Sequence, residues 1–117
     1  MVLGGDYNVI PENIDARFPL RWKNDALFQP ESRAAYRALL FQGYYDSFRT
    51  LHPDKMHGYT FWDYFQGSFE QDNGIRIDHL LASPEAADRL QKCWVNRKLR
   101  EREKASDHTP IMAEYRA

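Results

Sequence analysis

Four short segments of this chain carry carboxylate, amide and imidazole side chains suited to hydrolytic chemistry. In chain order they are residues 5–8 (Gly-Asp-Tyr-Asn), 59–64 (Tyr-Thr-Phe-Trp-Asp-Tyr), 76–81 (Arg-Ile-Asp-His-Leu-Leu) and 106–110 (Ser-Asp-His-Thr-Pro). When such groups converge in a fold, they provide what metal-assisted hydrolysis of a phosphodiester requires. The fold must therefore bring together segments that are far apart in the sequence.

Asp6 and Asn8 lie two residues apart after a short apolar run. In an extended segment they would point the same way, so one site could use both. Asp6 could then orient or deprotonate a water molecule, and Asn8 could hold a phosphate oxygen. The structural alternative is a turn stabilised by the Asp6 side chain, because Gly-Asp-x-Asn is ordinary turn chemistry.

Asp78 lies inside an apolar segment, where a carboxylate is costly unless it is paired. One candidate partner is Arg76, two residues away on the same face of a strand, which would give a structural ion pair. The other is an imidazole, because a carboxylate bound to histidine fixes its tautomer and stabilises its charged form. His79 points to the opposite face, and we expect it in the core or at its rim.

Asp107 and His108 place a possible metal ligand beside a possible general acid, general base or phosphate-polarising group. Hard cations such as Mg²⁺ take carboxylate oxygens and keep several waters, so one or two protein carboxylates can suffice. The structural alternative is a capped turn before a strand, with His108 exposed. His52 and His57 have no Cys or His at ligand spacing, and we interpret both as loop residues.

Aromatic and basic residues offer possible contacts to nucleic acid. Phe61 and Trp62 could form an aromatic wall for a base or a bare sugar. Core packing is the commoner role of such residues. Residues 97–104 contain five basic side chains, diluted by two glutamates, and such a run can touch phosphates. A solvated loop is the alternative.

The composition of the chain limits its class. The 117 residues, 43% of them hydrophobic, predict one domain over residues 1–117 with a substantial core. The net charge of −1 indicates no general attraction to polyanions. Cys93 is the single cysteine, which favours a reducing compartment, and we expect the cytoplasm. No apolar run approaches about 18 residues, and no leader pattern opens the chain, so we expect neither a membrane span nor a signal peptide.

The segments that must position these residues alternate between strand and helix patterns. They predict an α/β (α+β layered) fold with a mostly antiparallel sheet and helices on one face. Nothing in the chain is expected to cover the other face. We expect strands at 2–5, 44–49, 59–64, 75–82, 91–96 and 109–115, helices at 31–42 and 84–90 (capped by Ser83), an irregular stretch at 9–30 and a polar turn at 66–74.

Together, the four segments resemble the exonuclease III family of DNA-repair nucleases, within the wider endonuclease/exonuclease/phosphatase superfamily. The Gly-Asp-x-Asn and Ser-Asp-His-x-Pro elements are shared across that superfamily. Residues 59–64 and 74–78 narrow the resemblance to the exonuclease III and abasic-site endonuclease branch, and residues 6–11 and 73–81 are most similar to bacterial members. The resemblance extends from Leu3 to Tyr115.

The resemblance implies a fold, an activity and a set of site residues. The fold is a four-layer α/β sandwich, and the activity is Mg²⁺-dependent (Mn²⁺ being possible) hydrolysis of double-stranded DNA, as a 3′–5′ exonuclease and abasic-site endonuclease. Asp6 matches the family's acid that handles the attacking water or the leaving group, and Asn8 matches its phosphate-binding amide. Asp107 matches a metal ligand. His108 matches the histidine that polarises the phosphate, and Asp78 matches the carboxylate that orients this histidine. The implied DNA-binding residues are Phe61, Trp62, Ile75, Arg76 and Ile77; some relatives have Trp at position 75, and Ala105 replaces a common proline.

The family's amino-terminal half has no counterpart here. The chain therefore resembles the carboxy-terminal half of an exonuclease III, which would leave one face of its sheet uncovered and favours association, for example as a homodimer. Three hypotheses follow: an active nuclease, an impaired fragment that self-associates or complements a separate half, and a superfamily phosphatase. Residues 62–64 and 76–78 disfavour the last of these.

Overall fold

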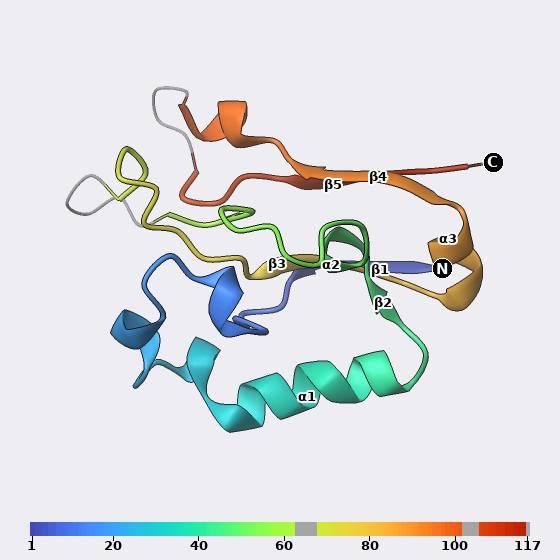
Figure 1. Cartoon of the computed structure of the whole chain (residues 1–117), viewed down its shortest axis with the longest axis horizontal. Helices are drawn as coiled ribbons and strands as arrows, with labels where there is room; N and C mark the ends of the chain where they lie inside the picture. The colour runs from blue at the N-terminus through green and yellow to red at the C-terminus, as the bar shows by residue number, and fades with distance from the viewer. Residues whose placement is uncertain (63–67, 102–105, 117) are drawn as a thin grey trace.

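The computed structural model describes residues 1–62, 68–101 and 106–116 and shows two antiparallel sheets (Figure 1). The first has the strand order β1-β3-β2, formed by β1 (Val2–Asp6), β3 (Asp78–Ala82) and the short β2 (Tyr45–Asp46). The second is a hairpin of β4 (Leu90–Val95) and β5 (Ile111–Tyr115). The expected α/β class with a mostly antiparallel sheet is confirmed.

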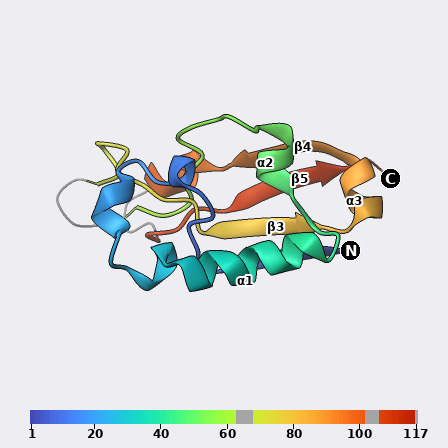
Figure 2. The same ribbon diagram turned by 60° about the horizontal axis from the view of Figure 1, so that its bottom comes forward.

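Helix α1 (Pro30–Phe41) covers one face of the first sheet (Figure 2). It begins with Pro30 in its first turn, and the left-handed Gly43 follows its end. Tyr36 of α1 packs with Val9 and Leu81, and Leu3 contacts the same cluster. The register pairs Leu3 with Leu81 and Gly4 with Leu80, so Gly4 and Leu80 face away from α1.

The segment expected as a strand at 44–49 is mostly helical. Only Tyr45 and Asp46 pair with β3, and α2 (Ser47–Leu51) begins directly afterwards. Asp46 causes the change, because its side chain accepts the backbone amide of Arg49 at 3.1 Å and so caps the helix. Helix α2 contacts both β3 and β4 and thereby joins the two sheets.

Two other expected strands are shorter or less regular than their sequences indicate. Within residues 59–62, Phe61 makes isolated bridges to Ile75 and His108 but no continuous ladder, and Asp63 and Tyr64 lie outside the described residues. The regular part of 75–82 begins only at Asp78. The second predicted helix is α3 (Pro84–Asp88), and Ser83 caps it as expected.

The irregular stretch at 9–30 contains three short 3₁₀ helices, η1 (Asn13–Asp15), η2 (Pro19–Trp22) and η3 (Ala26–Phe28). A further one, η5 (Arg97–Glu101), occupies part of the charged segment after β4. No helix in the described ranges is long and apolar enough to cross a membrane.

A buried ionic cluster holds these layers together. The guanidinium of Arg76, 1% exposed, donates to Asp15 at 2.7 Å and to both carboxylate oxygens of Asp46 at 2.7 and 2.9 Å. Burial opposes ionisation of Asp46, but the Arg76 charge prevails and lowers the pKa of Asp46 to about 2. His79 is fully buried, as expected of a core histidine; burial and Arg76 lower its pKa to about 4, so it is neutral at pH 7.

Candidate active site

Four of the residues singled out in the sequence meet at one end of the sheets. The Nδ1 atom of His108 lies 2.9 Å from Oδ2 of Asp78, and its Nε2 atom lies 3.7 Å from Asp6 and 4.0 Å from Asp107. One ligand atom each from Asp6, Asp78 and His108 lies within 4.8 Å of the others. The structure therefore brings the carboxylates and the imidazole into a single cluster.

Strand pairing explains how Asp6 and Asp78 meet. They are opposite each other in the antiparallel register of β1 and β3, on the face away from α1. Their side chains therefore point the same way, next to Gly4 and Leu80. Both acids lie at a strand end, where the side chains of Asp6 and Asp78 are still 38% and 15% exposed.

The segment 106–109 is held beside β3 by backbone hydrogen bonds to residues 60–62. Trp62 N donates to Asp107 O at 3.0 Å, and Thr109 N donates to Thr60 O at 2.8 Å. The backbone N–H of His108 donates to Ser106 Oγ at 3.1 Å. This contact forms a capped turn, which was the structural alternative for residues 106–108. The turn and the imidazole contact to Asp78 therefore coexist.

The partner of Asp78 is the imidazole of His108 and not Arg76. Arg76 points to the other side, into the buried cluster with Asp15 and Asp46. This position argues against the expected contact of Arg76 with DNA, because its guanidinium is buried and saturated by carboxylates.

Asn8 forms a turn with Asp6 beside the cluster. Its φ of +49° turns the backbone, so the argument from an extended segment fails at this residue. The backbone N–H of Asn8 donates to Oδ1 of Asp6 at 2.8 Å, and this contact forms the turn that the sequence offered as the structural alternative. In this turn, Oδ2 of Asp6 faces His108. Asn8 lines a separate depression next to α1, together with Tyr7 and Tyr36. The role of Asn8 as a phosphate ligand stays a prediction.

The expected DNA-binding aromatic and apolar residues are placed unequally. The Phe61 ring lies edge-on against His108, with 5.1 Å between centroids, at the rim of the cluster. Ile75, Ile77 and Trp62 are at most 3% exposed. Trp62 Nε1 donates to Asp72 at 3.0 Å, on the opposite side from Phe61. Ile75, Ile77 and Trp62 therefore lie in the core, which for Trp62 was the structural alternative. Of these four residues, only Phe61 borders the cluster in the described part of the chain.

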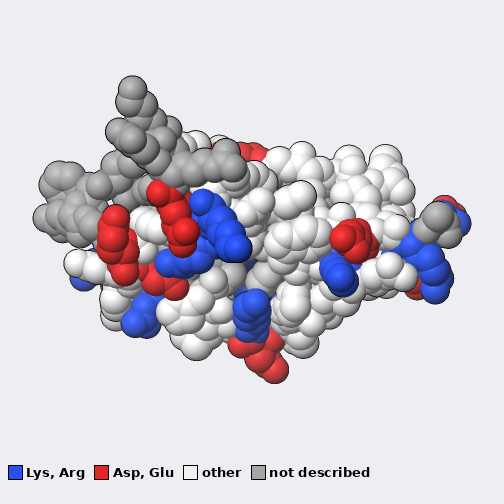
Figure 3. Space-filling model, turned by 90° about the horizontal axis from the view of Figure 1, so that it is seen from above, with Lys and Arg blue, Asp and Glu red and all other residues white. Residues whose placement is uncertain are grey.

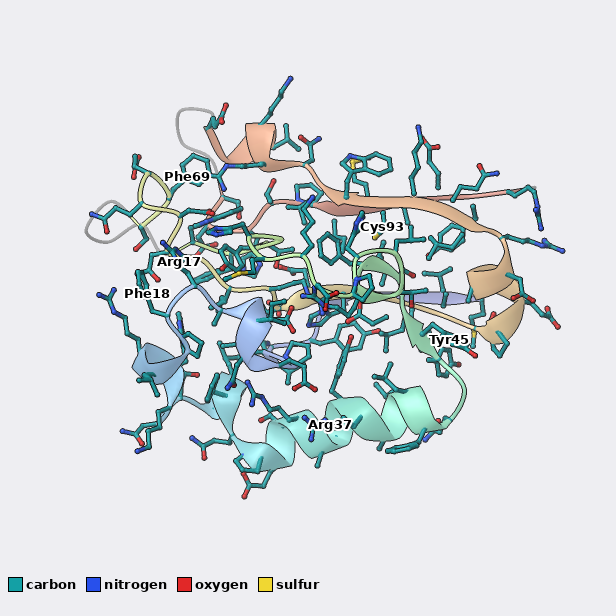
Figure 4. The ribbon with its side chains drawn as sticks, in the orientation of Figure 1. Arg17, Phe18, Arg37, Tyr45, Phe69 and Cys93 are labelled. Carbon is teal, nitrogen blue, oxygen red and sulfur yellow. The ribbon has the colours of Figure 1, made fainter. Side chains whose placement is uncertain are left out.

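His52, His57 and Arg97, the first residue of the charged segment, have structural partners. His57 and Arg97 both contact the Asp72 carboxylate, and His52 lies 2.9 Å from Cys93 O. Cys93 points from β4 into the protein (Figure 4), and burial raises its pKa to about 12, which makes the thiol unreactive.

The residues of the cluster fit a hard divalent cation. Asp6 and Asp107 present partly exposed carboxylates, and carboxylate oxygens are the ligands that Mg²⁺ and Mn²⁺ prefer. A pocket of about 440 Å³ opens beside Asp78 and His108, with room for a phosphate group. Its other walls are Gly4, Gly5, Leu80, Ser106, Thr109, Pro110 and Ile111.

The charge state of His108 depends on its carboxylate neighbours. Burial tends to lower the pKa of His108, but the hydrogen bond to Asp78 and the charges of Asp78, Asp6 and Asp107 outweigh it and raise the pKa above 6.5. A histidine whose folded-state pKa exceeds its unfolded value stabilises the fold fully below about pH 6.5. That contribution is lost as the pH rises through the folded-state pKa.

We therefore predict that His108 titrates above pH 6.5 and that Asp78→Asn lowers its pKa. NMR titration of the imidazole Cε1–H resonance measures both values. Asp88→Asn, which removes an exposed carboxylate from α3, is the matched control and leaves the His108 pKa unchanged. Identical titration curves for the wild type and Asp78→Asn contradict the prediction.

The sequence reasoning missed one residue at the site. Thr60 is fully buried, and its Oγ1 lies 3.1 Å from the amides of both Ile77 and Asp78. Threonine is common in strands, so its type at this position predicts nothing beyond strand structure. Only the spatial arrangement reveals the contact.

Comparison with known proteins identifies relatives of this chain. Residues 1–108 match the model of the Endonuclease/Exonuclease/phosphatase family. Exodeoxyribonuclease III of Haemophilus influenzae is 35% identical over 99% of this chain and 46% of its own length. An AP endonuclease of Archaeoglobus fulgidus is 41% identical with a TM-score of 0.92, covering 97% of this chain and 44% of its own.

A 3′ phosphatase from Neisseria, solved with a product DNA hairpin, is 36% identical with a TM-score of 0.93 and covers 97% of this chain and 44% of its own. The chain thus spans somewhat less than half the length of these relatives. Since the family match covers most of the chain, the protein belongs to the Endonuclease/Exonuclease/phosphatase family.

Proposed function

We propose that this chain carries the catalytic residues of a divalent-cation-dependent DNA-repair nuclease, with 3′–5′ exonuclease and abasic-site endonuclease activity. The observation that carries the proposal is the contact of His108 with Asp78 on one side and Asp6 on the other. The names of the relatives support DNA as the substrate: an exodeoxyribonuclease III, an AP endonuclease and a phosphatase bound to a DNA hairpin.

In this proposal, each side chain of the cluster contributes to hydrolysis. Asp78 accepts a hydrogen bond from the Nδ1–H group of His108. This bond fixes the orientation of the ring and directs Nε2 towards Asp6. The hydrogen bond to Asp78 favours the imidazolium of His108, which donates to a phosphate oxygen and stabilises its developing charge. Asp6 accepts the proton of the attacking water, whose oxygen bonds to phosphorus as the bond from phosphorus to the leaving sugar oxygen breaks, and the leaving oxygen takes up a proton from solvent.

Asp107, together with Asp6, would hold the cation, Mg²⁺ or alternatively Mn²⁺. When bound, such an ion supplies Lewis-acid polarisation of a phosphoryl oxygen. Asn8, whose backbone amide is bound by Asp6, would bind a phosphate oxygen through its side chain.

The test is cleavage of a duplex that carries one abasic site. We predict nicking at that site in Mg²⁺, no nicking with EDTA, and slower nicking by Asp107→Ala. Glu85→Gln, which changes an exposed acid on α3, is the control and cleaves at the wild-type rate. Equal cleavage by the wild type and Asp107→Ala excludes catalysis by the proposed site.

We further propose that the chain self-associates through the sheet face opposite α1. Leu80 and Ile111 line the pocket on that face, and Val2 at its edge is exposed. Viewed from above β4 and β5, the surface has a broad area without charged side chains (Figure 3). Apolar surfaces of this kind support association, either of two copies or with a separate polypeptide that corresponds to the rest of the relatives.

Light scattering at micromolar concentration tests this association. We predict a dimer for the wild type and a monomer for Leu80→Glu, because the buried charge would oppose sheet-to-sheet contact. Leu20→Glu is the matched control, since Leu20 is 84% exposed on η2, and it remains dimeric. A wild-type monomer refutes the homodimer.

We treat residues 1–117 as one domain and propose that it acts in the cytoplasm. The support for this location is the single free cysteine, Cys93, which is buried and needs no oxidising compartment.

A further inference from the structure

Thr60 lies between the two segments that carry the catalytic pair. On one side its amide donates to Ile75 O at 2.9 Å, and on the other its carbonyl accepts Thr109 N at 2.8 Å. Thr109 directly follows His108, and Ile75 lies three residues before Asp78. The backbone of Thr60 thus links the segment that carries His108 to the segment that carries Asp78.

The side chain of Thr60 continues this link where the backbone pairing ends. Phe61 and Ile75 exchange backbone hydrogen bonds, but residues 59–62 form no ladder with Ile77 and Asp78. In place of a carbonyl, Thr60 Oγ1 accepts the amides of Ile77 and Asp78, each at 3.1 Å. The contact to Ile77 is buried and the contact to Asp78 is partly buried, and a buried amide without an acceptor is costly.

The other edge of the same segment is also fixed. Ile77 O accepts the amide of Tyr7 at 3.0 Å, and Asp6 lies opposite Asp78 in the β1–β3 register. Residues 77 and 78 are therefore held between β1 and Thr60. The direction of the Asp78 side chain towards His108 depends on both restraints.

We propose that Thr60 is a positioning residue: by accepting the Ile77 and Asp78 amides, its Oγ1 holds the Asp78 carboxylate at hydrogen-bond distance from His108. Its importance for catalysis rests on the proposed function, whereas its effect on geometry does not. A residue that acts in this way contributes through preorganisation and does not touch the substrate.

Three variants separate this role from a general need for a buried hydroxyl. Thr60→Val keeps the shape of the side chain but removes the acceptor, whereas Thr60→Ser keeps the acceptor. Ser47→Ala removes another fully buried hydroxyl, which lies 3.0 Å from the Tyr115 hydroxyl and away from the cluster. Ser47→Ala therefore controls for the loss of stability alone.

The measurement is the NMR resonance of the His108 Nδ1 proton, which lies downfield when it is bound to a carboxylate. We expect this resonance in the wild type, Thr60→Ser and Ser47→Ala, and its upfield shift or loss in folded Thr60→Val. An unchanged resonance in Thr60→Val, or its loss in folded Thr60→Ser, overturns the proposal.

Amide hydrogen exchange of the unmutated protein provides a second test if Thr60→Val does not fold. The Ile77 and Asp78 amides are expected to exchange as slowly as the Leu81 amide in β3, and exchange as fast as an exposed loop amide overturns the proposal. Neither measurement uses DNA or a cation, so a failure of the nuclease assay and a failure of the Thr60 proposal are distinguishable.

Discussion

Replacing His108 with asparagine is expected to lower the rate of cleavage at an abasic site by about 10²–10⁴-fold, the usual contribution of a positioned general acid or base. Asparagine cannot carry the proton that the imidazole holds between Asp78 and the site. The change removes the hydrogen bond to Asp78 at 2.9 Å and the ring nitrogen that faces Asp6 at 3.7 Å. A single-turnover assay in Mg²⁺ measures the effect without interference from product release.

The matched control is His57→Asn. His57, like His108, contacts an aspartate through Nδ1, but its partner is Asp72 and lies outside the cluster. His57→Asn should therefore cleave at the wild-type rate. Equal losses in the two variants would show that the assay reports folding, and a wild-type rate for His108→Asn would contradict the assigned role.

Replacing Arg76 with methionine is expected to lower the free energy of unfolding by about 3–5 kcal/mol, because it leaves the buried carboxylate of Asp46 without its cation. Asp15 keeps Arg49 as a partner, whereas Asp46 loses both of its hydrogen bonds from a guanidinium. Tyr36 still donates to Asp46 at 2.8 Å, but a neutral donor cannot replace the charge. Urea unfolding followed by circular dichroism measures the difference.

Arg37→Met is the matched control for Arg76→Met. Arg37 lies on α1 (Figure 4) and pairs with Glu12 at 3.0 Å, with both side chains more than half exposed. Exposed pairs contribute about 0–1 kcal/mol, so Arg37→Met should be nearly neutral. A loss below about 1 kcal/mol for Arg76→Met contradicts the structural role of the buried cluster.

The pH dependence of stability provides an additional check on this cluster. The folded-state pKa of Asp46, about 2, is below that of an unfolded aspartate. Its contribution is therefore present above about pH 4 and is lost as the pH falls through about 2. In Arg76→Met this acid-dependent loss should shrink or disappear, since the charge that lowers the Asp46 pKa is absent and burial alone raises it.

Local patterns predicted the elements whose periodicity is clear from neighbouring residues. Helix α1 has the expected alanine- and leucine-rich sequence, and the hairpin of β4 and β5 occurs close to the expected ranges. The prediction of a strand at 44–49 was wrong. The aromatic residues of this segment are typical of strands, but Asp46 both ends the pairing with β3 and caps α2. Tertiary contacts decided this segment.

The sequence named the residues that meet in the cluster, but not the contacts that support them. The resemblance selected Asp6, Asp78 and His108, and the register of β1 and β3 brings the first two together. It did not predict that Arg76 would be buried with Asp46, because residues 46 and 76 are neighbours only in the folded protein. The orientation of Asn8 also depends on a left-handed backbone that the residue type permits but does not require.

A double-mutant cycle with Asp78→Asn and His108→Asn tests most directly whether these residues act as one unit. If Asp78 works through His108, the doubly substituted protein should cleave an abasic duplex no more slowly than His108→Asn alone, as in other catalytic units. Rate losses that multiply in the double variant would show that the two side chains act independently, and the arrangement described for the site would be wrong.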